Sequence, residues 1–235
     1  MVAVEAFVQK RVLVVFWIAL TVHCVFQYFQ SPYIAATKPL LVPLLLTFLL
    51  LRDNNIGRPA GKFVFYVGLF LALFGDILLI TVNVTFFLSG MIVFMVMNLC
   101  YAFCFYQLSR LRTSTILPFV FTALILAGIG YWLFSFLGDR LGDYRIPIII
   151  YMVTVSVMIC LAVNIVVNPV YRSAALQYFI PGSLVFLCEN LLVAVNRFYF
   201  ESNKNLYIPV IISYAFAQFL FAKGIQKAFL TGEEV

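Results

Sequence analysis

The chain has 235 residues, of which 65% are hydrophobic and 10% are charged, and its formal net charge is +6. A soluble domain of this size needs a surface rich in charged side chains, and too few are present to make one. The basic residues stand singly or in pairs between apolar runs, which is typical of membrane loops and argues against a nucleic-acid partner. The composition therefore indicates an integral membrane protein.

Apolar runs long enough to cross a bilayer recur along the whole chain. A membrane-spanning helix needs roughly 20 apolar residues. The run at residues 11–29 follows Lys10 and Arg11, as in a signal peptide, but it is longer than a signal-peptide core and has no clear cleavage site. Together the runs predict an all-α, polytopic membrane bundle of eight transmembrane helices, which forms a single domain over residues 1–235. The eight predicted spans cover residues 11–29, 34–51, 63–82, 85–107, 115–137, 146–167, 175–197 and 207–229.

Basic residues in the loops predict the orientation of these spans. Ten Lys and Arg residues fall on the side of the two termini, and five fall on the opposite side. Because cytoplasmic loops carry the excess of positive charge, we expect both termini in the cytoplasm.

The sequence also resembles itself at an offset of 113 residues. Residues 76–83 align with 189–196, and the triplet Tyr-Ala-Phe at 101–103 aligns with the same triplet at 214–216. An offset of four spans keeps the direction through the bilayer, so the alignment indicates two parallel four-helix repeats. The candidate repeats are residues 11–107 and 115–229.

Only two of the nine acidic residues lie within the predicted spans. Asp76 lies about two thirds of the way along span 63–82, and Glu189 has a similar position in span 175–197. An ionisable side chain within the bilayer is costly and usually faces a cavity or a partner. We therefore expect Asp76 and Glu189 to face each other in the outer half of the membrane as a catalytic pair. The alternative is a structural salt bridge from either acid to Lys38 or Arg197.

Six further polar residues are candidates for substrate binding, because they are expected near the acids or belong to the repeated segments. They are Lys38, Tyr151, His23, Asn190, Asn196 and Tyr214. Each also has a simpler structural interpretation. The lysine can extend its ammonium to the membrane interface, the histidine and tyrosines can be packing or interfacial residues, and the asparagines can bond neighbouring helices.

Two carboxyl groups in a poorly solvated pocket cannot both be ionised cheaply, so one keeps its proton while the other is a carboxylate. Such a pair supplies a general acid and a general base for a bond whose cleavage begins with protonation, as in acetal or glycoside chemistry. The single histidine and the five cysteines show no metal-binding spacing. No P-loop, dinucleotide fingerprint or serine-hydrolase elbow is present. We expect no metal and no cofactor.

At these residues the chain resembles the YhhN family of lysoplasmalogenase-like integral membrane hydrolases. The resemblance covers essentially the whole chain. It rests on five short segments in a common order, which are Thr37–Leu41, Gly75–Leu79, Tyr151–Met152, Gly182–Phe198 and Tyr214–Gln218.

The resemblance implies that a lysophospholipid of the membrane, a lysoplasmalogen, is the substrate. Its vinyl ether bond would be hydrolysed to a fatty aldehyde and glycerophosphocholine or glycerophosphoethanolamine, with two intramembrane aspartates as the catalytic pair. Asp76 matches the first aspartate. Cys188-Glu189 stands where the family has Ser-Asp, so the second acid is one methylene longer.

Two other functions remain open on the sequence. Paired acids in a pseudosymmetric bundle also suit a proton-coupled transporter. Alternatively, a non-catalytic family member would bind a lysolipid without cleaving it.

Overall fold

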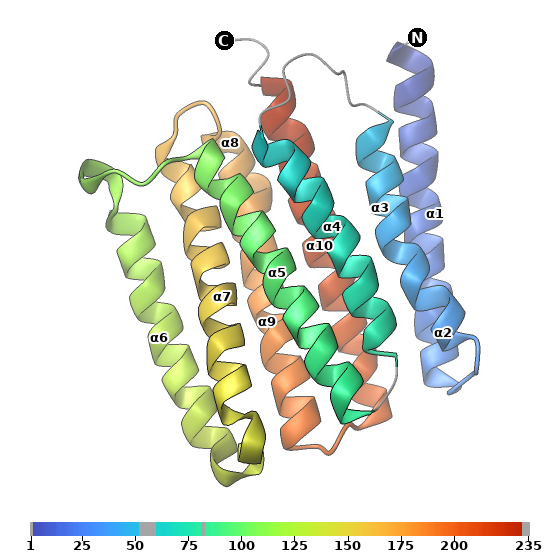
Figure 1. Cartoon of the computed structure of the whole chain (residues 1–235). Coiled ribbons are helices and arrows are strands. Elements are labelled where there is room, and N and C mark those ends of the chain that lie inside the picture. The colour runs from blue at the N-terminus through green and yellow to red at the C-terminus, as the bar shows by residue number, and fades with distance from the viewer. Residues whose placement is uncertain (1, 52–59, 81–82, 232–235) are drawn as a thin grey trace.

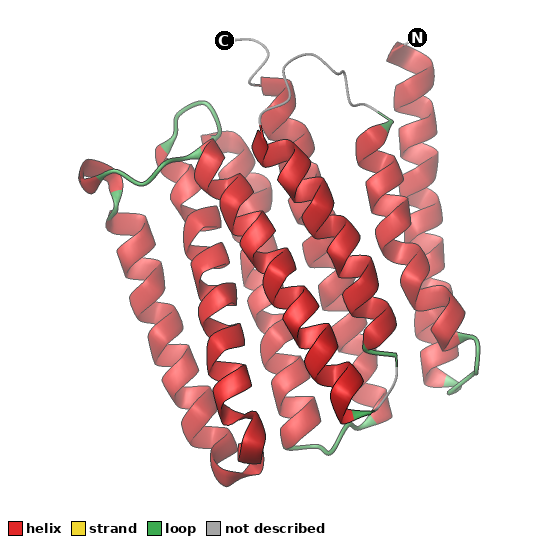
Figure 2. Cartoon of the chain, viewed as in Figure 1, coloured by secondary structure: helices red, strands yellow, loops and turns green. Residues whose placement is uncertain are grey.

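The protein is a bundle of long helices that run roughly alongside one another (Figure 1). The computed structural model describes residues 2–51, 60–80 and 83–231, and all regular elements in these ranges are helical (Figure 2). The longer helices are α1 (Val2–Tyr28), α3 (Leu41–Leu50), α4 (Ala60–Leu78), α5 (Val84–Leu108), α6 (Leu117–Leu137), α7 (Arg145–Asn164), α9 (Ile180–Phe198) and α10 (Tyr207–Thr231). The shorter ones are α2 (Ile34–Thr37), η1 (Lys38–Leu40), η2 (Thr113–Thr115), η3 (Gly138–Tyr144), η4 (Ile165–Val167), α8 (Arg172–Ala174), η5 (Ala175–Phe179) and η6 (Lys204–Leu206). The predicted all-α fold is confirmed.

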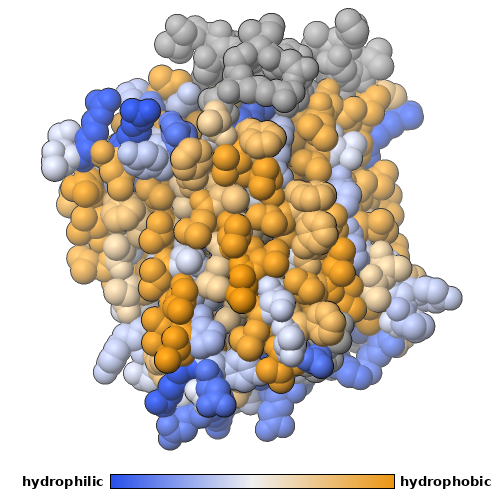
Figure 3. Space-filling model, in the orientation of Figure 1, coloured by the Kyte–Doolittle hydropathy of each residue, from blue (hydrophilic) through white to orange (hydrophobic). Residues whose placement is uncertain are grey.

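On the face that Figure 3 shows, the side of the bundle is largely apolar, and hydrophilic residues gather along its lower end and at its upper corners. Large hydrophobic side chains point outward along this band, including Leu117, Phe121 and Leu124 on α6. Such a surface suits a lipid solvent, because its side chains are apolar and the backbone groups along the middle of a helix bond within the helix. Several helices are long and apolar enough to cross a membrane. The chain is a multi-pass membrane protein.

The predicted count of eight spans is not confirmed. Within the described residues, six helical segments have the length and composition of a membrane span. One of them, Leu117–Val167, is a 51-residue run that includes both α6 and α7, which fold back on each other at η3. The apolar segment Ile34–Leu50 is shorter than a full span.

The segment Ile34–Leu50 is also broken, where the sequence predicts one continuous helix. Its first turn is α2, the 3₁₀ turn η1 follows, and α3 begins only at Leu41. Pro39 lies within η1, and proline cannot donate a backbone hydrogen bond to the preceding turn. The break places Lys38 at the junction of α2 and η1, close to the end of α4.

Two helix pairs pack especially closely, α4 against α5 and α9 against α10. Glycine permits this approach, since a Cβ atom on Gly75 of α4 would lie 2.7 Å from the ring of Phe94 on α5. A Cβ atom on Gly224 of α10 would likewise lie 2.6 Å from the ring of Phe179 in η5. Small residues commonly allow such contacts between membrane helices. Gly75 therefore allows α4 to approach α5 closely next to Asp76.

Helix α1 begins, and α10 ends, at the same end of the bundle (Figure 1). The cytoplasmic location of that end stays a prediction. The division into two repeats, at residues 11–107 and 115–229, also stays a prediction.

Candidate functional site

A cavity of about 420 Å³ lies within the bundle. Side chains from α1, α4, α5, α6, α7, α9 and α10 line it, and most of its wall is apolar. Both intramembrane acids, Asp76 and Glu189, contribute to the wall. The carboxyl groups come from α4 and α9, which are far apart in the sequence, and both line the same cavity.

Asp76 is buried and has two charged or polar partners. The Lys38 ammonium nitrogen Nζ lies 3.3 Å from its Oδ1 atom, in an ion pair. The Tyr214 hydroxyl donates a hydrogen bond of 3.0 Å to Oδ2. The salt bridge to Lys38 that the sequence left open is therefore present. Since Lys38 also lines the cavity, this ion pair lies on the cavity wall.

Glu189 is also buried, but its partner is neutral. The side-chain amide of Asn190 donates a hydrogen bond of 3.0 Å to Glu189 Oε2 and a second one of 2.7 Å to the Phe186 carbonyl. The Asn190 Oδ1 atom accepts a hydrogen bond of 2.7 Å from the Tyr151 hydroxyl. Asn190 thereby connects Glu189 on α9 with Tyr151 on α7. No basic side chain among residues 2–51, 60–80 and 83–231 lies within 4.0 Å of the Glu189 carboxyl group.

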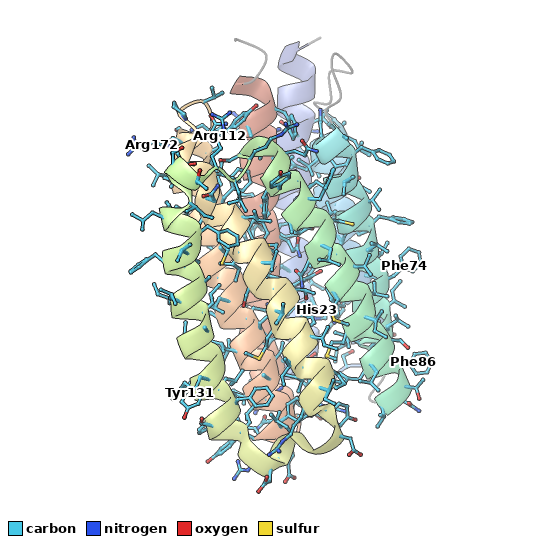
Figure 4. All side chains as sticks on the ribbon, turned by 60° about the vertical axis from the view of Figure 1, so that its left-hand side comes forward. His23, Phe74, Phe86, Arg112, Tyr131 and Arg172 are labelled. Atoms are coloured by element: carbon cyan, nitrogen blue, oxygen red, sulfur yellow. The ribbon has the colours of Figure 1, made fainter. Side chains whose placement is uncertain are left out.

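His23 lies on α1 in the interior, whereas Phe74, Phe86 and Tyr131 project outward (Figure 4). Its Nδ1 atom is 2.8 Å from the Thr37 hydroxyl, which joins α1 to the segment that carries Lys38. The histidine lines the cavity.

The structure brings together seven of the eight predicted site residues. Asn196 is the exception, because it is buried outside the cavity wall. Its backbone carbonyl accepts a hydrogen bond of 2.8 Å from the Ser202 amide, in the connection between α9 and α10. The cavity wall includes Asp76, Glu189, Lys38, Tyr151, His23, Asn190 and Tyr214. In the part of the chain that the structure describes, no three His, Cys, Asp or Glu side chains are grouped as a metal site.

Similarity to a known protein family extends over most of the chain. The model of the YhhN family matches residues 33–225, which is most of the chain. This chain belongs to the YhhN family. Searches of curated proteins and of solved structures gave no match. The region shared with the YhhN family includes both intramembrane acids, Lys38 and Tyr214, whereas His23 lies before it.

In this YhhN-family protein, the cavity has a polar end that the sequence reasoning missed. We call this end the cavity mouth and define it by the side chains of Gln27, Gln30, Arg197 and Lys204, which all line the cavity. They belong to the last turn of α1 and the loop after it, to the last turn of α9 and to η6. One signal was present in the sequence, because Arg197 follows Asn190 by seven residues and therefore shares its helix face.

Proposed function

We propose that this YhhN-family protein is an integral membrane hydrolase that cleaves the vinyl ether bond of lysoplasmalogens. The products would be a fatty aldehyde and glycerophosphocholine or glycerophosphoethanolamine. The observation that carries the proposal is that one cavity contains two buried carboxyl groups with different partners. Asp76 is paired with an ammonium, whereas Glu189 is bonded to a neutral amide.

The different partners support different roles for the two acids. A carboxylate is the form that an ammonium and a hydroxyl donor stabilise, so Asp76 is assigned as the general base. Among the described residues no cation pairs with Glu189 within 4.0 Å, and a buried carboxyl group without such a partner is held more cheaply as the neutral acid. Glu189 is therefore assigned as the general acid. This division is the one that acid-initiated ether cleavage requires.

The reaction follows in balanced steps. Glu189 gives its proton to the β-carbon of the vinyl ether, which leaves an oxocarbenium ion on the carbon bonded to oxygen. Water adds to that carbon while Asp76 takes one of its protons, and a hemiacetal forms. The Glu189 carboxylate then removes the hemiacetal hydroxyl proton, the carbon–oxygen bond to glycerol breaks, and Asp76 protonates the leaving alkoxide. Both acids return to their starting forms.

The surroundings of the acids suit a lipid substrate. Leu126, Leu133 and Val155 are among the residues that line the cavity on the side of α6 and α7, and an alkenyl chain buries its apolar surface against such side chains. The bond from Tyr151 to Asn190 holds the amide that contacts Glu189. The acids are therefore oriented by neighbouring helices, as an active site requires.

Aldehyde release from a lysoplasmalogen by the purified full-length protein tests the proposal. Wild-type protein should release aldehyde, and Asp76→Asn and Glu189→Gln should each lower the rate by about 10²–10⁴-fold, the usual contribution of a general acid or base. Asp143→Asn is the matched control, because Asp143 is an exposed acid in η3 outside the cavity wall. Its rate should equal that of wild type.

The same assay separates the two rival functions. A folded wild-type protein that binds the lysolipid without releasing aldehyde would be a binding member of the family, and the hydrolase proposal would be abandoned. Proton-coupled uptake of a solute into proteoliposomes, with no aldehyde formed, would instead favour the transporter.

A further inference from the structure

The cavity mouth contains two cations whose partners are not acids. The Arg197 guanidinium lies over the ring of Phe87, 4.8 Å from its centroid, and donates a hydrogen bond of 3.2 Å to the Ser202 hydroxyl. The Lys204 ammonium bonds the Gln30 side-chain carbonyl at 2.9 Å. Within the described ranges of the chain, no carboxylate lies within 4.0 Å of either cation. Both side chains thus present positive charge to the cavity.

From this arrangement we infer that Arg197 and Lys204 bind the phosphate of a lysophospholipid at the cavity mouth. The identity of the lipid rests on the proposed function, whereas the recognition of a phosphate rests on the two cations themselves. Guanidinium and ammonium groups are the side chains that bind phosphate oxygens through charge-assisted hydrogen bonds. Lys38 is not available for this role, because it is paired with Asp76.

The order of groups along the cavity matches the order of groups along the lipid. On α9, Arg197 lies in the last turn, Glu189 lies two turns deeper, and Phe186 lies beyond it. On α10, Tyr214 lies two turns deeper than the segment that carries Lys204. A lysoplasmalogen has its phosphate, its vinyl ether and its hydrocarbon chain in the same order. Cations, acids and apolar wall can therefore contact these three parts of one molecule.

The spacing is also compatible with this assignment. Arg197 follows Glu189 by eight positions, which corresponds to about 12 Å along the helix axis. Helical side chains lean toward the N-terminus, so the long arginine side chain shortens this gap. About six bonds, or roughly 7 Å when extended, separate the vinyl carbon from the phosphorus atom. One lysolipid can therefore reach both groups.

Backbone geometry at the mouth supports a ligand clamp. Gln30, Glu201 and Ser202 have positive φ angles of 51°, 50° and 65°, which non-glycine residues rarely adopt. Two of these residues hold the cations through their side chains, since Gln30 contacts Lys204 and Ser202 contacts Arg197. Unfavourable backbone conformations of this kind are concentrated at functional sites, where contacts maintain them.

A binding experiment that needs no turnover tests the inference. The probes are a saturated 1-O-hexadecyl lysophosphocholine, which has no vinyl ether to protonate, and 1-O-hexadecylglycerol, which has no phosphate. Binding of each to the purified full-length protein in detergent is measured by calorimetry. We expect wild type to bind the phosphocholine ether at least about tenfold more tightly than the glycerol ether, the value of one charge-assisted contact.

Arg197→Gln and Lys204→Gln should each weaken binding of the phosphocholine ether by about five- to tenfold and leave binding of the glycerol ether unchanged. Arg197→Lys should retain most of the preference for the phosphocholine ether over the glycerol ether. This variant keeps the positive charge, so it distinguishes an effect of lost charge from an effect of misfolding. Arg140→Gln is the matched control, because the Arg140 guanidinium also lies over a ring, that of Tyr199 at 4.1 Å, but is outside the cavity wall. Its binding should equal that of wild type.

Equal binding of the two ethers by wild type would overturn the inference, as would an Arg140→Gln loss as large as that of Arg197→Gln. Inorganic phosphate is the third probe. If it binds as tightly as the phosphocholine ether, the site recognises free phosphate and the assignment to a lipid head group is wrong. Because none of these measurements depends on aldehyde release, failure of the hydrolase proposal would be seen separately.

Discussion

The ion pair between Lys38 and Asp76 makes the sharpest energetic prediction. The nitrogen and oxygen are 3.3 Å apart, and the two side chains are 18% and 3% exposed. At an effective dielectric constant of about 20, opposite unit charges at this distance attract by about 5 kcal/mol. Removal of one partner leaves the other charge buried without compensation, which costs about 3–5 kcal/mol. Lys38→Met and Asp76→Asn should therefore each destabilise the protein strongly.

Wild type, the two single variants and the double variant form a double-mutant cycle, which isolates the interaction free energy between Lys38 and Asp76. Unfolding of the purified protein by a denaturant titration in detergent gives the four free energies of unfolding. We expect the double variant to lose clearly less stability than the two singles together, with a coupling of about 2 kcal/mol or more, because it has no unpaired buried charge.

The exposed ion pair of Arg145 and Asp139, at 2.9 Å, provides the matched control cycle. Screening by solvent should leave it without measurable coupling. A coupling between Lys38 and Asp76 that is no larger than that of the exposed pair would refute the reasoning, and with it the assignment of Asp76 as the ionised acid.

Three further predictions concern catalysis and packing. Tyr214→Phe removes the hydroxyl that donates a hydrogen bond to Asp76. The rate of aldehyde release should fall about tenfold, as expected for the loss of one hydrogen bond of about 1.4 kcal/mol. An unchanged rate would mean that this bond does not orient the base. The pH–rate profile of wild type should be bell-shaped, because low pH protonates the Asp76 base and high pH deprotonates the Glu189 acid; a rate independent of pH would argue against the pair. Gly75→Val should lower the thermal stability, because even the Cβ atom of the new side chain would lie 2.7 Å from the Phe94 ring. Gly128→Val is the control and should be as stable as wild type, because the space around Gly128 is open. Equal stability of both variants would contradict the packing argument.

The sequence was sufficient to predict the all-α fold class and to single out two acids that line one cavity. Composition alone indicates a membrane bundle, and the cost of burying a charge makes the only two acids within spans candidates for a shared cavity. The structure places Asp76 and Glu189 on one cavity wall. Periodicity and hydropathy do not indicate which side chains contact each other. The sequence therefore left the ion pair between Lys38 and Asp76 as one alternative among several.

Tertiary packing determines several features that the sequence pattern does not predict. Tyr101 and Tyr214 are equivalent under the predicted repeat, but the Tyr214 hydroxyl contacts Asp76, whereas the Tyr101 hydroxyl donates to Gln218 at 2.7 Å. The π-helical turn η5, which precedes α9, leaves no pattern in an apolar sequence. Asn196 aligns with Asn83 in the repeat, yet it is buried outside the cavity, while Asn83 caps α5 by accepting a hydrogen bond from the Thr85 amide.

The gradient of polarity along the cavity has a consequence for how the two products would leave. Glycerophosphocholine is water-soluble, and from the acids its path to water passes the polar groups of the mouth, such as Gln27 and Lys204. A long-chain aldehyde has no charge to draw it that way, and it lies against the apolar side chains of α6 and α7, where Leu126 and Leu133 line the cavity. One chemical step would thus divide an amphiphile between two phases, water for the head and bilayer for the chain.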